Sequence, residues 1–182
     1  MQIVDEIINK YKTNNDLYIG EKVTMSEHMI QSAMLAEQNR SSESLICACL
    51  LHDYGHFIID DPDFLVSKSL DGKHEEVAFN FFKDYFKPEV TEPIKLHVLA
   101  KRYLCRNKSY WDILSEASKV SLKFQGGIMK DNEAKKFTSL RFHKDAISLR
   151  KYDDDGKVSN IKIKKIDDYR NLINSQLIRS TI

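Results

Sequence analysis

The chain has 182 residues, with 28 Lys and Arg, 27 Asp and Glu, and a formal net charge of +1. That length suffices for one domain with a real core, and a charge near zero argues against the strongly basic surface of nucleic-acid-binding domains. No apolar run approaches the roughly 20 residues of a membrane span, and the N-terminus lacks a signal-peptide pattern. We expect one cytoplasmic domain over residues 1–182, a monomer or weak homo-oligomer, with neither membrane nor nucleic-acid partners.

Only six glycines and three prolines interrupt the chain, and strand-like alternation is scarce, which favours an all-α domain. Thr24 and Glu27 form the capping-box pattern at the start of one helix, and Gly126 and Gly127 follow the end of another. An acidic surface loop is expected at 60–63. The spacing of apolar residues predicts helices over about 2–12, 24–38, 41–52, 73–86, 88–103, 130–137, 142–151 and 166–178, and a loop followed by a helix within 108–124.

The three cysteines give no sign of a disulfide framework. Their number is odd and CxxC spacing is missing, and Cys47 and Cys49 would lie on different sides of one helix. We expect Cys47, Cys49 and Cys105 to be free thiols in a reducing compartment.

A His-Asp pair, His52-Asp53, ends an apolar helix within the segment Leu-Leu-His-Asp-Tyr-Gly-His at 50–56. Other histidines recur around it at intervals of 24, 22 and 23 residues, each about one helix plus one loop: His28, His52, His74 and His97. Each lies on the apolar face of its predicted helix. In an antiparallel bundle, four such side chains can converge on one interior point, as they do in bundle cofactor sites. The alternative is four unconnected core histidines.

Imidazoles combined with a carboxylate suit zinc, iron, copper or nickel better than magnesium or calcium. Asp53 would be able to reach a second ion as a bridging carboxylate, and one carboxylate from the C-terminal half would complete the site. His56 lies four residues beyond His52, although Gly55 is expected to bend the chain between them. Lys101, one helical turn beyond His97 on the inward face, must either extend to water or meet an anion.

The order of His28, His52-Asp53 and an aspartate near 153 resembles the HD-domain superfamily of metal-dependent phosphohydrolases, and His74 and His97 resemble its two-metal branch. The resemblance narrows to the mixed-valent diiron oxygenases. Within these it is greatest to the organophosphonate-cleaving group typified by 2-amino-1-hydroxyethylphosphonate dioxygenase, with myo-inositol oxygenase more distant. The similar segments lie between about 17 and 157, and the most specific is His-Val-Leu-Ala-Lys-Arg-Tyr-Leu-Cys at 97–105; the others are 18–21, 26–29, 50–56, 124–127 and 149–153.

The resemblance implies an all-α HD-domain bundle with two iron ions, Fe(II) and Fe(III), in its core and O2 as co-substrate. It implies that His74 and His97 hold one iron, that Asp53 bridges, and that the other iron is held by His28, His52, Asp53 and Asp153. Asp153 is chosen over Asp154 and Asp155 because the family pattern places a lysine four residues after the ligand, where this chain has Lys157.

The implied substrate is a small 1-hydroxy-(amino)alkylphosphonate, such as 2-amino-1-hydroxyethylphosphonate or its trimethylammonium analogue. Its C–P bond would be cleaved with O2 to give a carboxylate (glycine or betaine) and inorganic phosphate. His56 and Lys101 are expected at the phosphonate, which accounts for the inward lysine. Ser121 and Gln125 are expected as further substrate contacts, Glu21 at the amino end, and Tyr18 at the open position of the second iron in the absence of substrate.

Two alternatives stay open. One is an HD phosphohydrolase that acts on a nucleotide or other phosphate ester through a metal-activated water, without oxygen. The other is a regulatory module that binds metal or ligand without catalysis.

Overall fold

The computed structural model of the chain describes residues 2–18, 21–59 and 72–178. In these ranges the regular structure is helical apart from two isolated bridges, Leu17–Thr24 and Phe86–Leu177, and the all-α prediction is confirmed. The acidic loop expected at 60–63, and residues 19 and 20 of the segment 18–21, lie outside the described residues.

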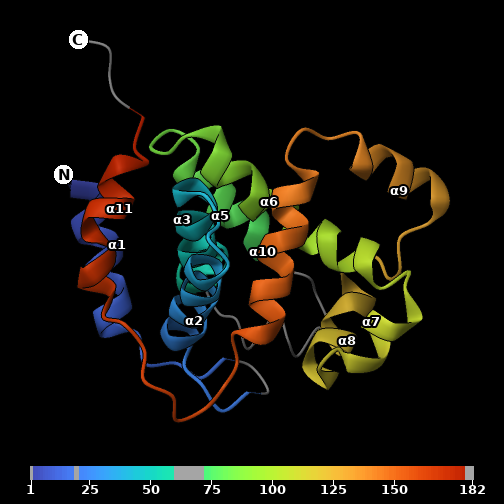
Figure 1. Cartoon of the computed structure of the whole chain (residues 1–182), viewed down its shortest axis with the longest axis horizontal. Coiled ribbons are helices and arrows are strands. Elements are labelled where there is room, and N and C mark those ends of the chain that lie inside the picture. The colour runs from blue at the N-terminus through green and yellow to red at the C-terminus, as the bar shows by residue number, and fades with distance from the viewer. Residues whose placement is uncertain (1, 19–20, 60–71, 179–182) are drawn as a thin grey trace.

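The described helices pack as a bundle with two flanking layers (Figure 1). Figure 1 shows α2, α3, α5, α6 and α10 gathered in the middle, α1 and α11 side by side along one edge, and α7 to α9 beyond α10. In chain order the elements are α1 (Gln2–Thr13), α2 (Met25–Gln38), α3 (Glu43–Leu51), the 3-10 helix η1 (Tyr54–Phe57), α5 (His74–Phe82), α6 (Pro88–Leu104), α7 (Lys108–Ile113), α8 (Glu116–Phe124), α9 (Asp131–Thr138), α10 (His143–Asp155), η2 (Ile166–Tyr169) and α11 (Arg170–Ser175).

The predicted helix ends at local signals are confirmed. The Thr24 hydroxyl accepts a hydrogen bond from the backbone N–H of Glu27 (3.1 Å), and the Glu27 carboxylate accepts one from the N–H of Thr24 (2.8 Å). This capping box satisfies two N–H groups that the first turn of α2 leaves without helical partners. After α8, Gly126 and Gly127 have φ angles of 91° and 68°, which residues with a Cβ rarely adopt.

Three predicted boundaries were wrong. α10 continues to Asp155 instead of ending near 151, so Asp153 lies on a helix and not in a loop. α5 ends at Phe82, before the predicted 86. The expected C-terminal helix begins as the 3-10 helix η2 and ends at Ser175. These ends depend on tertiary contacts, which local propensity does not report.

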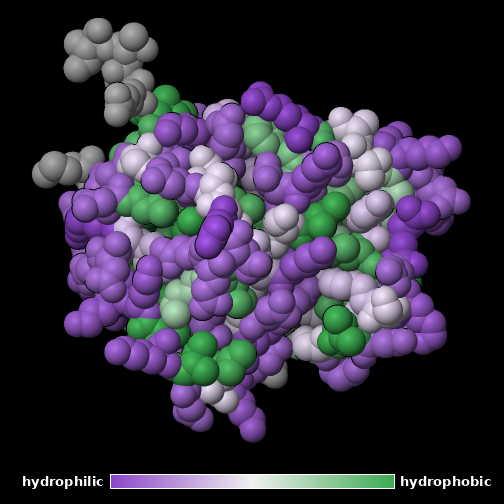
Figure 2. Space-filling view, viewed as in Figure 1, coloured by the Kyte–Doolittle hydropathy of each residue, from purple (hydrophilic) through white to green (hydrophobic). Residues whose placement is uncertain are grey.

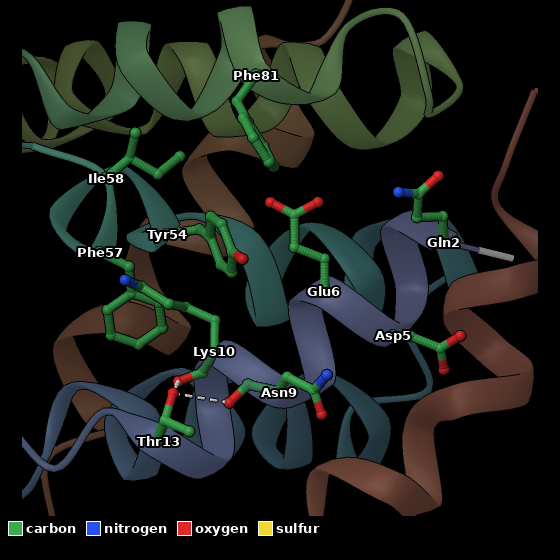
Figure 3. A pocket seen from close by; sticks show the side chains of 10 residues that line it. All are labelled: Gln2, Asp5, Glu6, Asn9, Lys10, Thr13, Tyr54, Phe57, Ile58 and Phe81. Carbon is green, nitrogen blue, oxygen red and sulfur yellow. Dashed lines mark hydrogen bonds between the residues drawn. The ribbon is translucent and has the colours of Figure 1, made fainter.

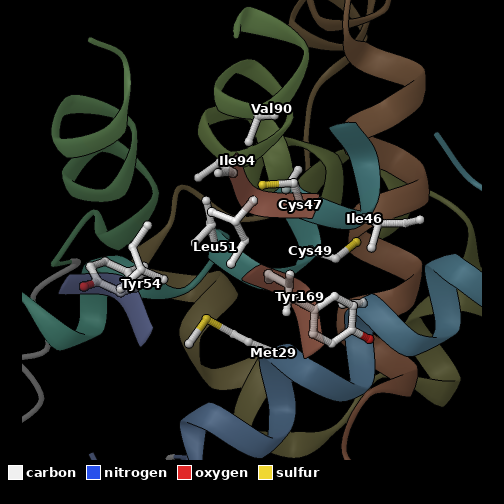
Figure 4. Packing of buried hydrophobic residues seen from close by; sticks show 14 of the residues in the cluster. Met29, Ile46, Cys47, Cys49, Leu51, Tyr54, Val90, Ile94 and Tyr169 are labelled. Atoms are coloured by element: carbon white, nitrogen blue, oxygen red, sulfur yellow. The ribbon is translucent and has the colours of Figure 1, made fainter. Parts of the chain in front are cut away.

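The main core fills the space between the central helices and the α1–α11 edge (Figure 4). Met29, Leu51 and Tyr169 are buried within it together with the thiols of Cys47 and Cys49. All three cysteines are free, as predicted, and all three are buried. Figure 2 shows mostly hydrophilic side chains on one face, with separate apolar patches. Among the described helices, none is long and apolar enough to cross a bilayer.

Candidate metal centre and substrate site

The six predicted metal ligands come from six different elements and converge in the core. Each side chain is buried, with at most 9% of its residue surface exposed. They are His28 on α2, His52 at the C-cap of α3, Asp53 just before η1, His74 at the start of α5, His97 on α6 and Asp153 on α10.

The six side chains form two triads. In the first, His28, His52 and Asp153 each offer a ligand atom within 4.8 Å of the others; in the second, Asp53, His74 and His97 do the same. The Nε2 atoms of His28 and His52 are 3.2 Å apart, and those of His74 and His97 are 3.1 Å apart. Two nitrogens bound at about 2.1 Å to one ion at roughly a right angle would be separated by about 3 Å. Each histidine pair is therefore spaced for one cation.

Asp53 lies between the two triads. Its Oδ1 is 3.2 Å from Nε2 of His74 and 3.5 Å from that of His97. Its Oδ2 faces the other pair, 3.5 Å from Nε2 of His28 and 3.4 Å from that of His52. One carboxylate thus presents a separate oxygen to each histidine pair, which is the arrangement a bridging ligand requires.

Backbone carbonyls fix the orientation of three of the rings. Nδ1 of His28 donates to the Gly156 carbonyl oxygen (3.0 Å). Nδ1 of His52 donates to Cys49 (2.9 Å), and Nδ1 of His97 to Ile94 (2.7 Å). Because a carbonyl oxygen only accepts, each Nδ1 carries a proton, and each Nε2 is the ring nitrogen left to bind a cation. This is the outer-shell contact typical of histidine ligands.

Each of the two aspartates has one carboxylate oxygen without a hydrogen-bond partner among the described residues. These oxygens, Oδ2 of Asp53 and Oδ1 of Asp153, are both buried. Burial acts to raise both pKa values, but His52 beside Asp53 and Arg150 beside Asp153 hold them well below the usual range. Buried ionised oxygens without a hydrogen-bond partner are costly unless a cation binds. The donor set therefore fits two metal ions, of the kinds that accept imidazole with carboxylate.

The predicted phosphonate contacts adjoin this centre. Lys101 is only 3% exposed, and its Nζ donates to the hydroxyl of Ser121 on α8 at 2.9 Å. Burial, followed by the charge of Arg150, lowers the pKa of Lys101 to about 7. Gln125, at the end of α8, has a buried Oε1 without a hydrogen-bond partner in the described structure. The inward lysine is thus an amine beside polar groups of a second helix.

Two further predicted residues stack on histidine rings. His56 stacks on His74, with ring centroids 4.3 Å apart, and burial followed by the nearby His74 lowers its pKa to about 3. Tyr18 stacks on His28, at 4.4 Å between centroids. Tyr18 therefore lies beside the first triad, whereas the sequence prediction assigned it to the iron of His74 and His97. Its role as a ligand of that iron stays a prediction.

Glu21 lines a small cavity beside the centre, with Tyr110, Asp154 and Lys157. A larger cavity, of about 720 Å³, lies elsewhere, along α1, η1 and α5. Figure 3 shows Glu6, Tyr54 and Phe81 among its lining side chains. None of the predicted site residues lines that cavity, so its size does not mark it as the active site.

Comparison with known proteins separates the alternatives. The HD-domain family model matches residues 25–137, which include five of the six predicted ligands. Hydroxymethylphosphonate dioxygenase of Gimesia maris is 38% identical over 182 residues, covering 97% of this chain and 89% of the relative. The glycine-betaine-forming [1-hydroxy-2-(trimethylamino)ethyl]phosphonate dioxygenase of Leisingera caerulea is 40% identical over 152 residues, covering 83% and 78%. An uncharacterized protein of Acanthamoeba polyphaga mimivirus is 38% identical over 185 residues, covering 100% and 84%.

The chain belongs to the HD-domain phosphonate dioxygenases. The resemblance inferred from the motifs is thereby confirmed. The assignment of individual ligands and substrate contacts stays a prediction, supported by the geometry above.

In this HD-domain dioxygenase, sequence reasoning missed the role of Arg150. Its Nη1 donates to Oδ2 of Asp153 at 2.6 Å, and its guanidinium also bonds Asp154. Nη2 further donates to the Ser118 hydroxyl and Nε to that of Tyr110, both at 3.3 Å. Arg150 therefore orients the Asp153 carboxylate while leaving its Oδ1 toward His28. The only sequence signal was the spacing of three residues between Arg150 and Asp153, which is common on exposed helix faces.

Gly55 is required where η1 meets the start of α5. A Cβ at this position would overlap the backbone carbonyl of His74. We expect Gly55→Ala to destabilise the fold by about 1–3 kcal/mol and to lower metal content, because the backbone that carries His74 must move. Chemical denaturation and elemental analysis measure the two effects. As a control, Gly127→Ala meets no atom within 4 Å but has a φ of 68°, so it should cost about 1–2 kcal/mol and leave metal content unchanged. Equal metal loss in both variants would contradict this role of Gly55.

Proposed function

We propose that this protein is a diiron oxygenase that uses O2 to cleave the C–P bond of a 1-hydroxyphosphonate. The observation that carries the proposal is the position of Asp53, which presents one oxygen to each of two buried histidine pairs. Relatives that span most of the chain are named as phosphonate dioxygenases, which supports the reaction class.

The reaction balances with one O2 for each substrate. A 1-hydroxyphosphonic acid and O2 give a carboxylic acid and phosphoric acid, so the C–P and C–H bonds break while the carbon is oxidised and dioxygen is reduced. Two iron ions held by His28, His52, Asp53 and Asp153, and by Asp53, His74 and His97, would supply the redox chemistry that zinc lacks.

The other residues hold the substrate and keep water out. Lys101 provides a positive charge for the phosphonate, and Ser121 fixes its Nζ. His56, stacked on His74 and uncharged near neutral pH, is in place to exchange a hydrogen bond with the same group. Gln125 supplies a second polar group from α8, and Glu21 meets the end of the substrate remote from the phosphonate. Together these contacts would orient the hydroxyl-bearing carbon toward the metal ions.

Oxygen dependence tests the proposal. Protein loaded anaerobically with iron is mixed with hydroxymethylphosphonate or with 1-hydroxy-2-(trimethylamino)ethylphosphonate. We expect phosphate release only after O2 is admitted, with equal amounts of O2 consumed and phosphate formed. A coupled Fe(II)/Fe(III) signal in electron paramagnetic resonance should accompany the active state. Phosphate release from a phosphate ester without O2 would support the phosphohydrolase alternative and overturn the oxygenase.

A further inference from the structure

The ring of His28 is oriented by a distant part of the chain, unlike the rings of His52 and His97. In His52 and His97, Nδ1 donates to a carbonyl oxygen three residues earlier in the chain. His28 donates to the Gly156 carbonyl oxygen, which is 128 residues away. The orientation of His28 therefore depends on whatever holds the segment that carries Gly156.

The Gly156 carbonyl lies beyond the last turn of α10. That helix ends at Asp155, and residues 156–158 have no regular secondary structure. The segment lies close against α2, because a Cβ on Gly156 would come within 2.6 Å of Oγ of Ser32 and 3.0 Å of its backbone nitrogen. Val158 is 51% exposed, so packing of its side chain does not anchor the segment. Another contact must hold the backbone in place.

Gln31 on α2 supplies that contact with both ends of its amide. Its Nε2 donates to the Val158 carbonyl oxygen at 3.0 Å, and its Oε1 accepts from the Val158 N–H at 2.9 Å. Gln31 is only 4% exposed, and buried polar groups with all their hydrogen bonds made keep a structure rigid. Lys157 also reaches the centre, with Nζ 3.6 Å from Oδ1 of Asp153, but its flexible stem fixes the backbone less closely.

The two contacts lie next to each other on α2. His28 and Gln31 are three residues apart and share one face of that helix, and their partners, Gly156 and Val158, are two residues apart. Helices α2 and α10 pack side by side (Figure 1). They carry His28 and Asp153 of the first triad. Gln31 thus ties the chain that leaves α10 to the helix that carries a metal ligand.

We propose that Gln31 is a positioning residue for the metal centre. By fixing Val158 it holds the Gly156 carbonyl against Nδ1 of His28, which directs Nε2 of His28 toward the ion of the first triad. The proposal rests on the proposed function, because it assigns Gln31 to one of the two metal ions. It predicts an effect on the first triad and none on the second, since the ring of His97 is oriented from its own helix.

Exchange of the histidine ring protons with solvent tests the proposal in Gln31→Met, which keeps the length of the side chain and removes its amide. Zinc replaces iron for this measurement by NMR, because it is diamagnetic and binds imidazole and carboxylate. We expect the Nδ1 proton of His28 to exchange at least roughly 10-fold faster than in the wild type, and those of His52 and His97 within about 2-fold of it. A His28 proton as slow as in the wild type would overturn the role of Gln31.

The affinity for zinc should change at one site of two. Losing an outer-shell contact typically weakens metal binding 10- to 100-fold, so Gln31→Met should bind one zinc ion at least roughly 10-fold more weakly in competition with a chelator. The other ion should keep its affinity. Equal weakening of both ions would overturn the assignment of Gln31 to the first triad.

Gln176→Met is the matched control. Gln176, at the C-cap of α11, is 3% exposed. Its Oε1 accepts from the Ser44 hydroxyl at 2.7 Å, and its Nε2 donates to the Glu43 carboxylate at 3.2 Å. The control thus also loses a buried amide with bonds at both ends, and it should leave His28 and both zinc ions unaffected. The same acceleration at His28 in Gln176→Met would indicate a general loss of stability and overturn the proposal.

Gly156→Ala displaces the same carbonyl with Gln31 intact, because its new methyl group would overlap Ser32. We expect the same selective acceleration at His28, and a His28 proton that stays protected would overturn the role of the carbonyl. None of these measurements depends on turnover. Absence of O2-dependent phosphate release from the iron-loaded wild type would overturn the proposed function, whereas ring-proton exchange decides the role of Gln31.

Discussion

Asp53→Asn is expected to lower kcat/KM severely and to reduce metal content below one ion per chain. The substitution keeps the size of the side chain but removes its charge and one of the two oxygens that face the histidine pairs. Replacing an outer-shell partner typically costs 10- to 100-fold, so loss of a ligand shared by both ions should cost more, on the order of 1000-fold in kcat/KM.

Elemental analysis and O2-dependent phosphate release measure the two effects in the same preparation. Asp84→Asn is the matched control, because Asp84 is exposed in the turn after α5. The Asp84→Asn protein should bind two ions and keep its activity. Circular dichroism checks that Asp53→Asn folds, as we expect for a core whose apolar cluster is untouched. A folded Asp53→Asn protein with two ions and normal turnover would refute the bridging role.

The histidine pattern could be recognised in the sequence because one histidine occurs on each of four successive helices at a nearly constant interval. Intervals of 24, 22 and 23 residues place His28, His52, His74 and His97 on successive helices. Burial of the apolar face of each helix then turns these side chains into the core. The capping box of Thr24 was likewise visible, because its two hydrogen bonds join residues three apart in the chain.

The position of Asp153 could not be read in the same way. Three consecutive aspartates are poor helix formers, so the sequence predicts that α10 ends before them. In the structure, Arg150 binds both Asp153 and Asp154 and holds that last turn helical. The sequence alone does not distinguish a buried arginine from an exposed one. The contacts that distinguish it, Ser118 and Tyr110, lie 32 and 40 residues away in the chain.

Lys101→Met is expected to raise KM for a phosphonate substrate by roughly 30- to 1000-fold while iron content stays unchanged. Methionine fills similar volume but leaves a dianion facing Ser121 without a cation, and truncation of one partner of a buried charge pair costs about 2–4 kcal/mol. Ser121→Ala should have a smaller effect, roughly 10-fold, because only the hydrogen bond that fixes Nζ is lost. An unaltered KM in the Lys101→Met enzyme would show that Lys101 does not bind the phosphonate.

The same lysine should set the alkaline limb of the pH profile. Its pKa of about 7 results from burial and from Arg150 and Lys157, opposed by Asp153 and Asp154. As pH rises above 7 the free enzyme loses this proton and its charge, so kcat/KM for a dianionic substrate should fall about tenfold per unit. A bound dianion favours the charged lysine, so kcat should depend on pH less steeply than kcat/KM.

The Lys101→Arg variant is the control, because arginine keeps its charge at all these pH values. The ratio of wild-type to Lys101→Arg kcat/KM, in which ionisation of the substrate cancels, should therefore decline through pH 7 and beyond. A ratio independent of pH would show that a group other than Lys101 controls the limb.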